Sequence, residues 1–306
     1  MDKVWRNYAE QVDLLRDRGL MVKDRASAEE FLSQVNYYRL EGYFRYWQID
    51  PENKDNRFIS GSSFDTIKRL YQDEQALLFV CDEVLRPIEA LLRTRFAYYY
   101  AEKVSEVGDY VKGKGFVQQR PKRVEEYVRA SLDLSKERFV AHYRVGEEKS
   151  YEYPDMPIWV AVEVLSFGCL SRMIEASYES GVLASLADSM NVGVKDLPGQ
   201  VRSFVYLRNR IAHCAKIWNH SVIDKAGLVP KISGRAKRRY RSFSDESIYK
   251  TFVALDYVAS QSGLNDSWLS DRVEPILKAN RLLAAGIATP AKYGQMPTDL
   301  LTRCAI

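Results

Sequence analysis

The segment SFVYLRNRIAHCAKIWN, residues 203–219, decides the fold class of this chain. Its apolar residues recur at spacings of three and four, which is the pattern of a helix with one buried face. We therefore predict a helix over about residues 200–219, after a break at Pro198-Gly199, packed against a helical core. The apolar stripe consists of Phe204, Leu207, Ile211, Cys214 and Trp218.

Helical patterns continue outward from this segment, and strand patterns are few. Ser27 and Glu30 form a capping-box pattern that predicts the start of a helix. Apolar residues at helical spacing predict a long helix after Ser63, which Pro87 either kinks or divides in two. The polar composition of residues 50–62 indicates a loop.

Together these patterns predict an all-α fold. We expect one main domain over residues 1–225, with an N-terminal helical extension over about residues 1–60. Residues 226–306 are expected to form a basic connector and a C-terminal helical appendage. Within the main domain, Pro157 is expected to begin a helix that Gly168 interrupts.

The composition is that of an ordinary globular protein, with 46% hydrophobic and 28% charged residues. The net charge of +4 gives weak support to a nucleic-acid partner. The 20 Tyr residues suit stacking on bases, although packing at the rims of helical cores explains them better. Four widely separated cysteines without a C-x-x-C pair predict neither a disulfide framework nor a zinc site. Without a signal peptide or a membrane-spanning apolar run, we expect a cytoplasmic protein.

The candidate chemistry lies on the polar side of the predicted helix. Asn209 and His213 lie about 40° apart on a helix, opposite the apolar stripe, and Arg208 flanks that stripe. Arginine suits a phosphate, and histidine transfers protons near neutral pH. RNA supplies its own nucleophile, the 2′-hydroxyl, so such a set needs neither a metal nor a cofactor. These three residues are the candidate catalytic residues.

The spacing of these residues does not by itself establish a catalytic site. Arg208 and His213 are five residues apart, about 140° around a straight helix, so they converge only if the helix distorts or a second copy contributes. An R-x4-H pattern also occurs by chance in many proteins. His142 has no recognisable partner pattern, and His220, near the expected helix end, is either structural or an accessory phosphate contact.

A second candidate RNA contact lies in residues 220–243, where cations cluster with Tyr240 and Phe243. The cations would contact the RNA backbone while the aromatic rings stack on bases. A solvated, flexible loop is the alternative, and we prefer it slightly. The candidate RNA-binding residues are Lys231, Arg235, Lys237, Arg238, Arg239 and Arg241.

Several segments carry, in order, a resemblance to a known family. Through them the chain resembles the abortive-infection (Abi) family of bacterial phage-defence proteins, of the AbiD/AbiF type, within the HEPN superfamily of helical ribonucleases. The resemblance covers roughly residues 8–220. The segments are Leu15-Arg16-Asp17-Arg18-Gly19-Leu20, Asn36-Tyr37-Tyr38-Arg39-Leu40-Glu41-Gly42-Tyr43, Ile88-Glu89-Ala90-Leu91-Leu92-Arg93-Thr94, Pro157-Ile158-Trp159, Glu163-Val164-Leu165-Ser166-Phe167-Gly168, Leu207-Arg208-Asn209-Arg210-Ile211-Ala212-His213 and Trp218-Asn219.

The resemblance implies a HEPN-like helical bundle, a dimeric active cleft and RNA cleavage. It places the motif arginine at Arg208, the motif histidine at His213 and the neighbouring polar residue at Asn209. Some toxins of the superfamily carry a tyrosine two residues after the motif histidine, which a partner enzyme modifies. Ala215 stands at that position, so we expect no control of that kind.

Four more residues are candidates to line the implied cleft. Glu163 and Ser166 are two of them, although packing between helices would account for both residues equally well. Arg210 and His220 are the other two.

The leading prediction is a metal-independent endoribonuclease toxin of phage defence that acts as a homodimer and leaves 2′,3′-cyclic phosphate ends. One alternative is a non-catalytic RNA-binding module or toxin–antitoxin component that binds a structured RNA. Another is a helical protein in which the motif is incidental. A toxin needs restraint by an antitoxin, protein or RNA, which no segment identifies.

Overall fold

The computed structural model describes residues 4–117, 122–147 and 150–303. Helices dominate these ranges, and the only sheet in them pairs β1 (Gln48–Asp50) with β2 (Asp55–Phe58) in antiparallel fashion. The predicted all-α fold class is therefore confirmed. Within the same ranges, none of the helices combines the length and apolar character that a membrane span requires.

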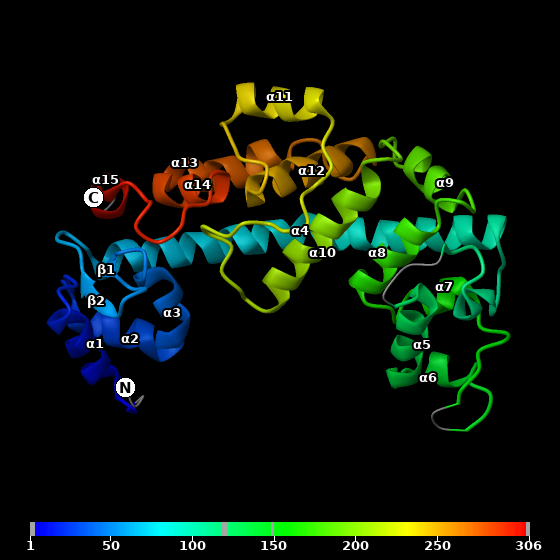
Figure 1. Ribbon diagram of the computed structural model, residues 1–306, viewed down its shortest axis with the longest axis horizontal. Coiled ribbons are helices and arrows are strands. Elements are labelled where there is room, and N and C mark those ends of the chain that lie inside the picture. The colour runs from blue at the N-terminus through cyan, green and yellow to red at the C-terminus, as the bar shows by residue number, and fades with distance from the viewer. Residues whose placement is uncertain (1–3, 118–121, 148–149, 304–306) are drawn as a thin grey trace.

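The helix α4 (Phe64–Lys103) runs along most of the length of the molecule (Figure 1). Ser63 caps its start, because the Ser63 hydroxyl accepts a hydrogen bond from the Asp65 amide at 3.2 Å. Pro87 lies inside this one helix and does not divide it. Buried side chains recur along its whole length, so α4 is the central element on which the others pack.

The N-terminal elements gather at one end of α4 (Figure 1). The capping prediction for Ser27 is wrong: Asp24 is the N-cap, and its carboxylate accepts a hydrogen bond from the Ser27 amide at 3.0 Å. The β1–β2 hairpin occupies part of residues 50–62, where the sequence predicted only a loop, because its short polar strands carry no alternating pattern. The helices of this end are α1 (Tyr8–Asp17), α2 (Arg25–Gln34) and α3 (Tyr37–Phe44).

The opposite end of α4 carries the short helices of the middle of the chain. A helix does begin after Pro157, but it ends at Ala161. Gly168 does not interrupt it, because Gly168 lies in the first turn of the next helix, α8 (Phe167–Ala176). The remaining elements here are η1 (Asp109–Lys112), α5 (Val124–Leu134), α6 (Arg138–Ala141), α7 (Ile158–Ala161) and α9 (Val182–Ser189).

The helix α10 (Leu197–Ala212) packs on α8 and α4 and carries the sequence motif. Its predicted start is wrong, because Pro198 and Gly199 lie in its first turn. Proline is tolerated there since the first amides of a helix have no partner inside the helix. Its predicted end near residue 219 is also wrong, because the helix stops at Ala212.

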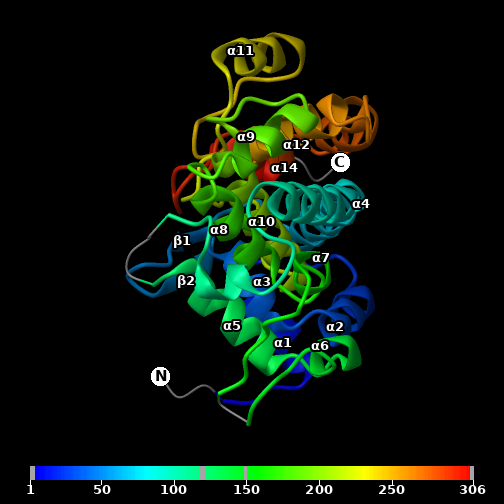
Figure 2. The same cartoon turned by 90° about the vertical axis from the view of Figure 1, so that its right-hand side faces the viewer.

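The C-terminal helices pack along α4 and α10. The Trp268 indole donates a hydrogen bond to the Val80 carbonyl at 3.0 Å, which ties this part of the chain to α4. Residues 230–239, predicted as part of a connector, form the helix α11, which contacts the next helix of the chain and lies at the outer edge of the molecule (Figures 1 and 2). The elements are α11 (Pro230–Arg239), α12 (Ile248–Gln261), η2 (Leu269–Val273), α13 (Glu274–Ala279), α14 (Arg281–Ala288) and α15 (Thr298–Arg303).

Candidate active site

The motif arginine is held by a carboxylate from α4. Arg208 lies near the C-terminal end of α10, and its Nε is 3.5 Å from Oε2 of Glu89. One terminal nitrogen of Arg208 also donates a hydrogen bond to the Asn209 side-chain oxygen at 3.4 Å. Only about 37% of the Arg208 side chain is exposed, so this ion pair fixes the guanidinium more firmly than a fully solvated pair would.

Glu89 extends this ion pair into a network. Arg93, one turn further along α4, also pairs with Glu89. The same guanidinium donates a hydrogen bond to the Leu165 carbonyl at 2.7 Å, and another to the Val162 carbonyl. Arg208 is therefore linked through α4 to the turn between α7 and α8. The sequence offered a signal for this network, since Glu89 and Arg93 have the spacing of a helical ion pair.

The motif histidine lies just outside the helix. His213 caps the end of α10, and its amide donates a hydrogen bond to the Asn209 carbonyl at 3.1 Å. The chain then turns sharply, because Cys214 adopts a left-handed backbone conformation with φ of 46°. The His213 side chain is exposed and forms no hydrogen bond or ion pair with Arg208. The angle of about 140° that a straight helix would place between Arg208 and His213 therefore does not describe their arrangement, because His213 lies outside the helix.

The segment that follows His213 is fastened at several points. Arg39 of α3 donates a hydrogen bond to the Cys214 carbonyl, and Arg210 donates one to the Lys216 carbonyl. The Lys216 ammonium donates a hydrogen bond to the Gly42 carbonyl at 2.8 Å. Helix α3 and the end of α10 together fix the path of the chain beyond His213.

Glu74 of α4 anchors the same segment from inside the core. One of its carboxylate oxygens accepts hydrogen bonds from the amides of Ile217 and Trp218, both at 2.6 Å. The other oxygen accepts one from the Tyr43 hydroxyl. Glu74 is fully buried, and burial raises its pKa against the effect of these donors. Sequence reasoning missed Glu74, because a glutamate on a helix carries no sign of burial in its own pattern.

Two titratable groups near the motif have pKa values lowered by burial. The pKa of Lys216 falls to about 8, although the charge of Glu74 opposes that fall. Its ammonium lies 4.6 Å from the centre of the Tyr46 ring. The pKa of His220 falls to about 4, and its ring stacks on Tyr206 with centres 5.9 Å apart. A neutral His220 at pH 7 supplies no positive charge for a phosphate contact.

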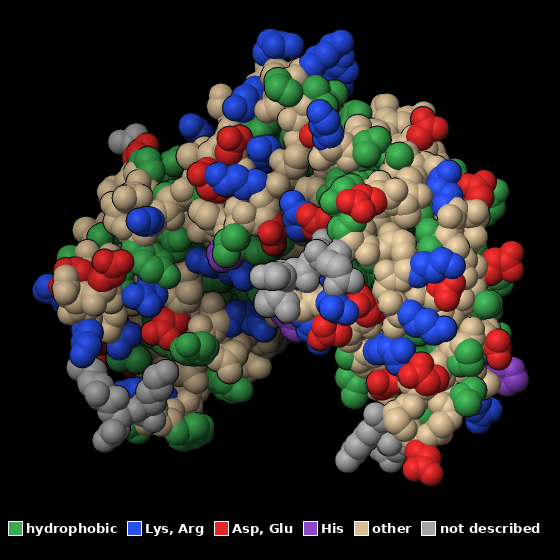
Figure 3. All heavy atoms as spheres, turned by 45° about the vertical axis from the view of Figure 1, so that its right-hand side comes forward, with side chains coloured by type: hydrophobic (Ala, Val, Ile, Leu, Met, Phe, Trp, Pro, Cys, Tyr) green, Lys and Arg blue, Asp and Glu red, His purple; other side chains and the backbone are tan. Residues whose placement is uncertain are grey.

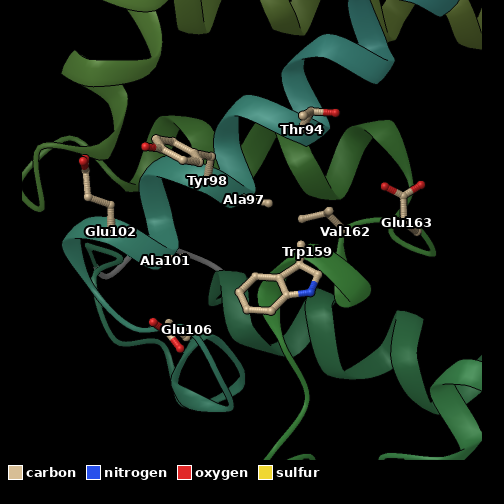
Figure 4. A pocket seen from close by; sticks show the side chains of 9 residues that line it. All are labelled: Thr94, Ala97, Tyr98, Ala101, Glu102, Glu106, Trp159, Val162 and Glu163. Atoms are coloured by element: carbon tan, nitrogen blue, oxygen red, sulfur yellow. The ribbon is translucent and has the colours of Figure 1, made fainter.

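The other candidate cleft residues, Glu163 and Ser166, lie between α7 and α8. The Ser166 hydroxyl accepts a hydrogen bond from the Cys169 amide at 3.1 Å and so caps α8. Glu163 is exposed and lines a groove around Trp159 (Figure 4). Both flank the turn that Arg93 holds.

Asn209 lines a different hollow, of about 340 Å³, between α8 and α10. Arg172 and Arg202 line it as well, together with Glu175, which pairs with Arg202. Asp224 also lines this hollow, so the two arginines there face two carboxylates.

The candidate RNA-binding residues divide into two kinds. Arg241 forms a bidentate ion pair with Glu274 at 2.8 and 3.2 Å, and Glu274 is almost fully buried, so this arginine stabilises the fold. The others are exposed and lie on α11, where Lys and Arg side chains gather at the top of Figure 3. These exposed cations are Lys231, Arg235, Lys237, Arg238 and Arg239.

The face that carries the motif is hollowed. In Figure 1 the end of α10 points between the N-terminal elements and the α5–α7 part of the molecule. Figure 3 shows a deep hollow between these two parts, with Lys and Arg side chains on its wall. In the described ranges, no three His, Cys, Asp or Glu side chains lie together as a metal-binding group. Cys81, Cys169 and Cys214 are free thiols, and Cys304 lies outside the described residues.

Comparisons with known proteins bear on these residues. A family model described as "Abi-like protein" matches residues 30–219. The matched range begins in α2 and ends just after the segment fastened by Glu74, so it contains the whole Arg208 network. Searches of curated proteins and of solved structures gave no match.

Proposed function

The chain belongs to the Abi-like protein family, and from that membership we propose that it is a metal-independent endoribonuclease of abortive infection. Arg208 and His213 would be its catalytic residues. The proposal includes the HEPN type of active site, a cytoplasmic location and a restraining antitoxin.

One observation carries this proposal. Arg208, Asn209 and His213 lie near the C-terminal end and at the cap of one helix, α10, and that end points toward a hollow with Lys and Arg side chains on its wall (Figures 1 and 3). The buried residues of the same helix, Phe204 and Leu207, hold that end against the core. An exposed histidine supplies a group for proton transfer, and an oriented arginine supplies a cation for the phosphate, in cleavage by an internal nucleophile.

In the proposed reaction the phosphorus stays bonded to the 3′-oxygen of one ribose, forms a bond to the 2′-oxygen of that ribose and loses its bond to the 5′-oxygen of the next nucleotide. A histidine removes the proton of the 2′-hydroxyl, whose oxygen attacks the phosphorus while the bond to the 5′-oxygen breaks. Arg208 stabilises the charge that develops on the phosphate. The 5′-oxygen leaves with a proton, so the products are a 2′,3′-cyclic phosphate and a 5′-hydroxyl.

The two proton transfers favour a two-fold dimer. Each copy carries a single exposed His213, whereas the reaction uses one base and one acid. A second copy related by a two-fold axis would bring a second His213 into the same hollow. The hollow between the two parts of the molecule leaves room for such an approach.

Cleavage of labelled total RNA in the presence of a chelator tests the proposal. The wild type should leave cyclic-phosphate ends, and His213→Ala should lower the rate by about 10²–10⁴-fold. His142→Ala is the matched control, because His142 is exposed in another part of the molecule. Equal activity in all three proteins would refute the proposed site.

The exposed cations of α11 favour a second candidate function, a non-catalytic RNA-binding module. Such a module binds RNA that it does not cleave. Its binding of uncleavable, 2′-O-methylated RNA should be the same in the wild type and in His213→Ala, and neither protein should produce cyclic-phosphate ends.

A further inference from the structure

A second concave surface lies near the end of α4, around α7. It is a groove of about 550 Å³, and Trp159 of α7 lies at its centre (Figure 4). Tyr98 of α4 stands beside it. On the other side of Trp159 is another hollow, of about 410 Å³, lined by Phe139 and Tyr143. The two hollows share Trp159 and Glu163, so they form one surface with Trp159 as the ridge between them.

Large aromatic side chains are unusually exposed on this surface. Trp159 is 50% exposed, Tyr98 is 64% exposed and Phe139 is 41% exposed. Exposed aromatic residues that border a hollow mark sites where proteins bind a partner. Tryptophan and tyrosine also supply a large part of the binding energy at such sites.

Among the described residues, every Asp, Glu, Lys or Arg side chain that lines this surface is a glutamate. Glu102, Glu106 and Glu163 line the first hollow, with Glu102 and Glu106 on one side of Trp159 and Glu163 on the other (Figure 4). None of the described Lys or Arg residues lines either hollow, although the chain as a whole carries a net charge of +4.

Most of this negative charge is not neutralised. Glu102 has a weak neighbour in Lys103, with their charged atoms 3.8 Å apart. Within the described residues, Glu106 and Glu163 form no ion pair. A ligand that fits this surface must therefore bring positive charge, and the phosphates of an RNA would be repelled.

We propose that this surface, the Trp159 groove, binds a segment of another protein that carries Lys or Arg together with apolar side chains. A cationic side chain would lie on the Trp159 ring and pair with Glu106 or Glu163. The two hollows on either side of the ridge match two side chains of one extended segment. A single small cation would not fill both hollows. The occupant is a protein, and the proposed catalytic residues Arg208, Asn209 and His213 do not line the groove.

Peptide binding to the full chain tests this proposal. The probe is a short fluorescent peptide of alternating arginine and leucine, and its partner is the same peptide with glutamate in place of arginine. The arginine peptide should bind more tightly, and Trp159→Ala should weaken it about tenfold, as expected for a desolvated cation–π contact. The charge reversal Glu106→Lys with Glu163→Lys should weaken it at least as much.

A matched control separates the groove from the overall charge. Glu30→Lys with Glu52→Lys makes the same change in net charge at exposed carboxylates of the N-terminal elements. This control should change the affinity for the arginine peptide less than twofold. Equal losses in groove and control variants, or equal affinity for the two peptides, would overturn the proposal. Weaker binding of 2′-O-methylated RNA by Trp159→Ala would also overturn it, because the occupant would then be a nucleic acid.

Discussion

Nε of Arg208 lies 3.5 Å from Oε2 of Glu89, so the motif arginine on α10 is oriented by a carboxylate from α4. Glu89 also holds Arg93, whose guanidinium reaches the turn before α8. Glu89 thus acts through other residues and is a positioning residue for the proposed reaction.

The first prediction concerns this positioning. Glu89→Gln removes the charge that fixes Arg208, so RNA cleavage should slow about tenfold or more. Affinity for 2′-O-methylated RNA should stay the same or increase, because a negative charge near the phosphate is lost. The control is Glu83→Gln on the same helix, which breaks the exposed ion pair with Arg272. A parallel loss of cleavage in Glu83→Gln would mean that α4 charge in general, and not Glu89, is responsible.

The second prediction concerns Lys216. Its folded pKa of about 8 lies below the ordinary lysine value of 10.5, so the unfolded chain binds more protons between these pH values. The free energy of unfolding of the wild type should therefore rise as the pH rises through that window. Lys216→Met lacks the titrating group, so this rise should be absent from its pH profile. Urea midpoints of both proteins near pH 7.5 and pH 9.5 measure this difference. Lys112→Met, at an exposed lysine, should behave like the wild type, and identical pH profiles for all three would contradict the assignment.

The third prediction concerns the close approach of α14 to Trp218. A Cβ atom at Gly286 would lie 2.4 Å from the Trp218 indole nitrogen, so Gly286→Ala should lower the free energy of unfolding by about 1–3 kcal/mol. Gly42→Ala is the control, because a Cβ atom at Gly42 in α3 meets nothing within 4 Å. That variant should gain roughly 0.5–1 kcal/mol from helix propensity. Urea denaturation that ranks the two in reverse order would refute the packing argument.

The fourth prediction concerns the exposed cations of α11. Joint replacement of Lys237, Arg238 and Arg239 by alanine should weaken binding to single-stranded RNA. The slope of log affinity against log salt should fall by about 2, at ~0.7 for each lost phosphate contact. An unchanged slope would exclude α11 from the RNA contact. Arg241→Ala should instead destabilise the fold by roughly 3–5 kcal/mol, because it leaves Glu274 buried without its partner.

The sequence predicted the structure best where an element depends only on residues close to it in the chain. Ser63 and the apolar spacing after it correctly predicted the start of α4, since both depend on neighbours within one helix. The end of α10 was misplaced because Cys214 and Trp218 continue the helical spacing by coincidence. Trp218 is buried by Glu74 and α14, which come from distant parts of the chain.

In the candidate site, too, residues that belong to a local pattern could be predicted, and residues that depend on distant parts of the chain could not. Arg208, Asn209 and His213 could be selected from one short segment, and the structure places them near the C-terminal end of α10 and at its cap. Glu74 could not be selected, because its importance depends on amides more than 140 residues away. The α11 helix was missed for a related reason: its only buried residue among those described is Ala236, so it has almost no apolar pattern.

The single long helix α4 sets the distance between the segments that its side chains bind. At ~1.5 Å per residue, Glu74 and Glu89 stand roughly 22 Å apart on one rigid rod. The rod has one weak point between them, since Pro87 cannot donate the backbone hydrogen bond that would tie it to the preceding turn. Bending of the rod at Pro87 would move the arginine held by Glu89 relative to the histidine segment held by Glu74. The geometry of the candidate site therefore depends on the straightness of a helix that contributes no catalytic residue to it.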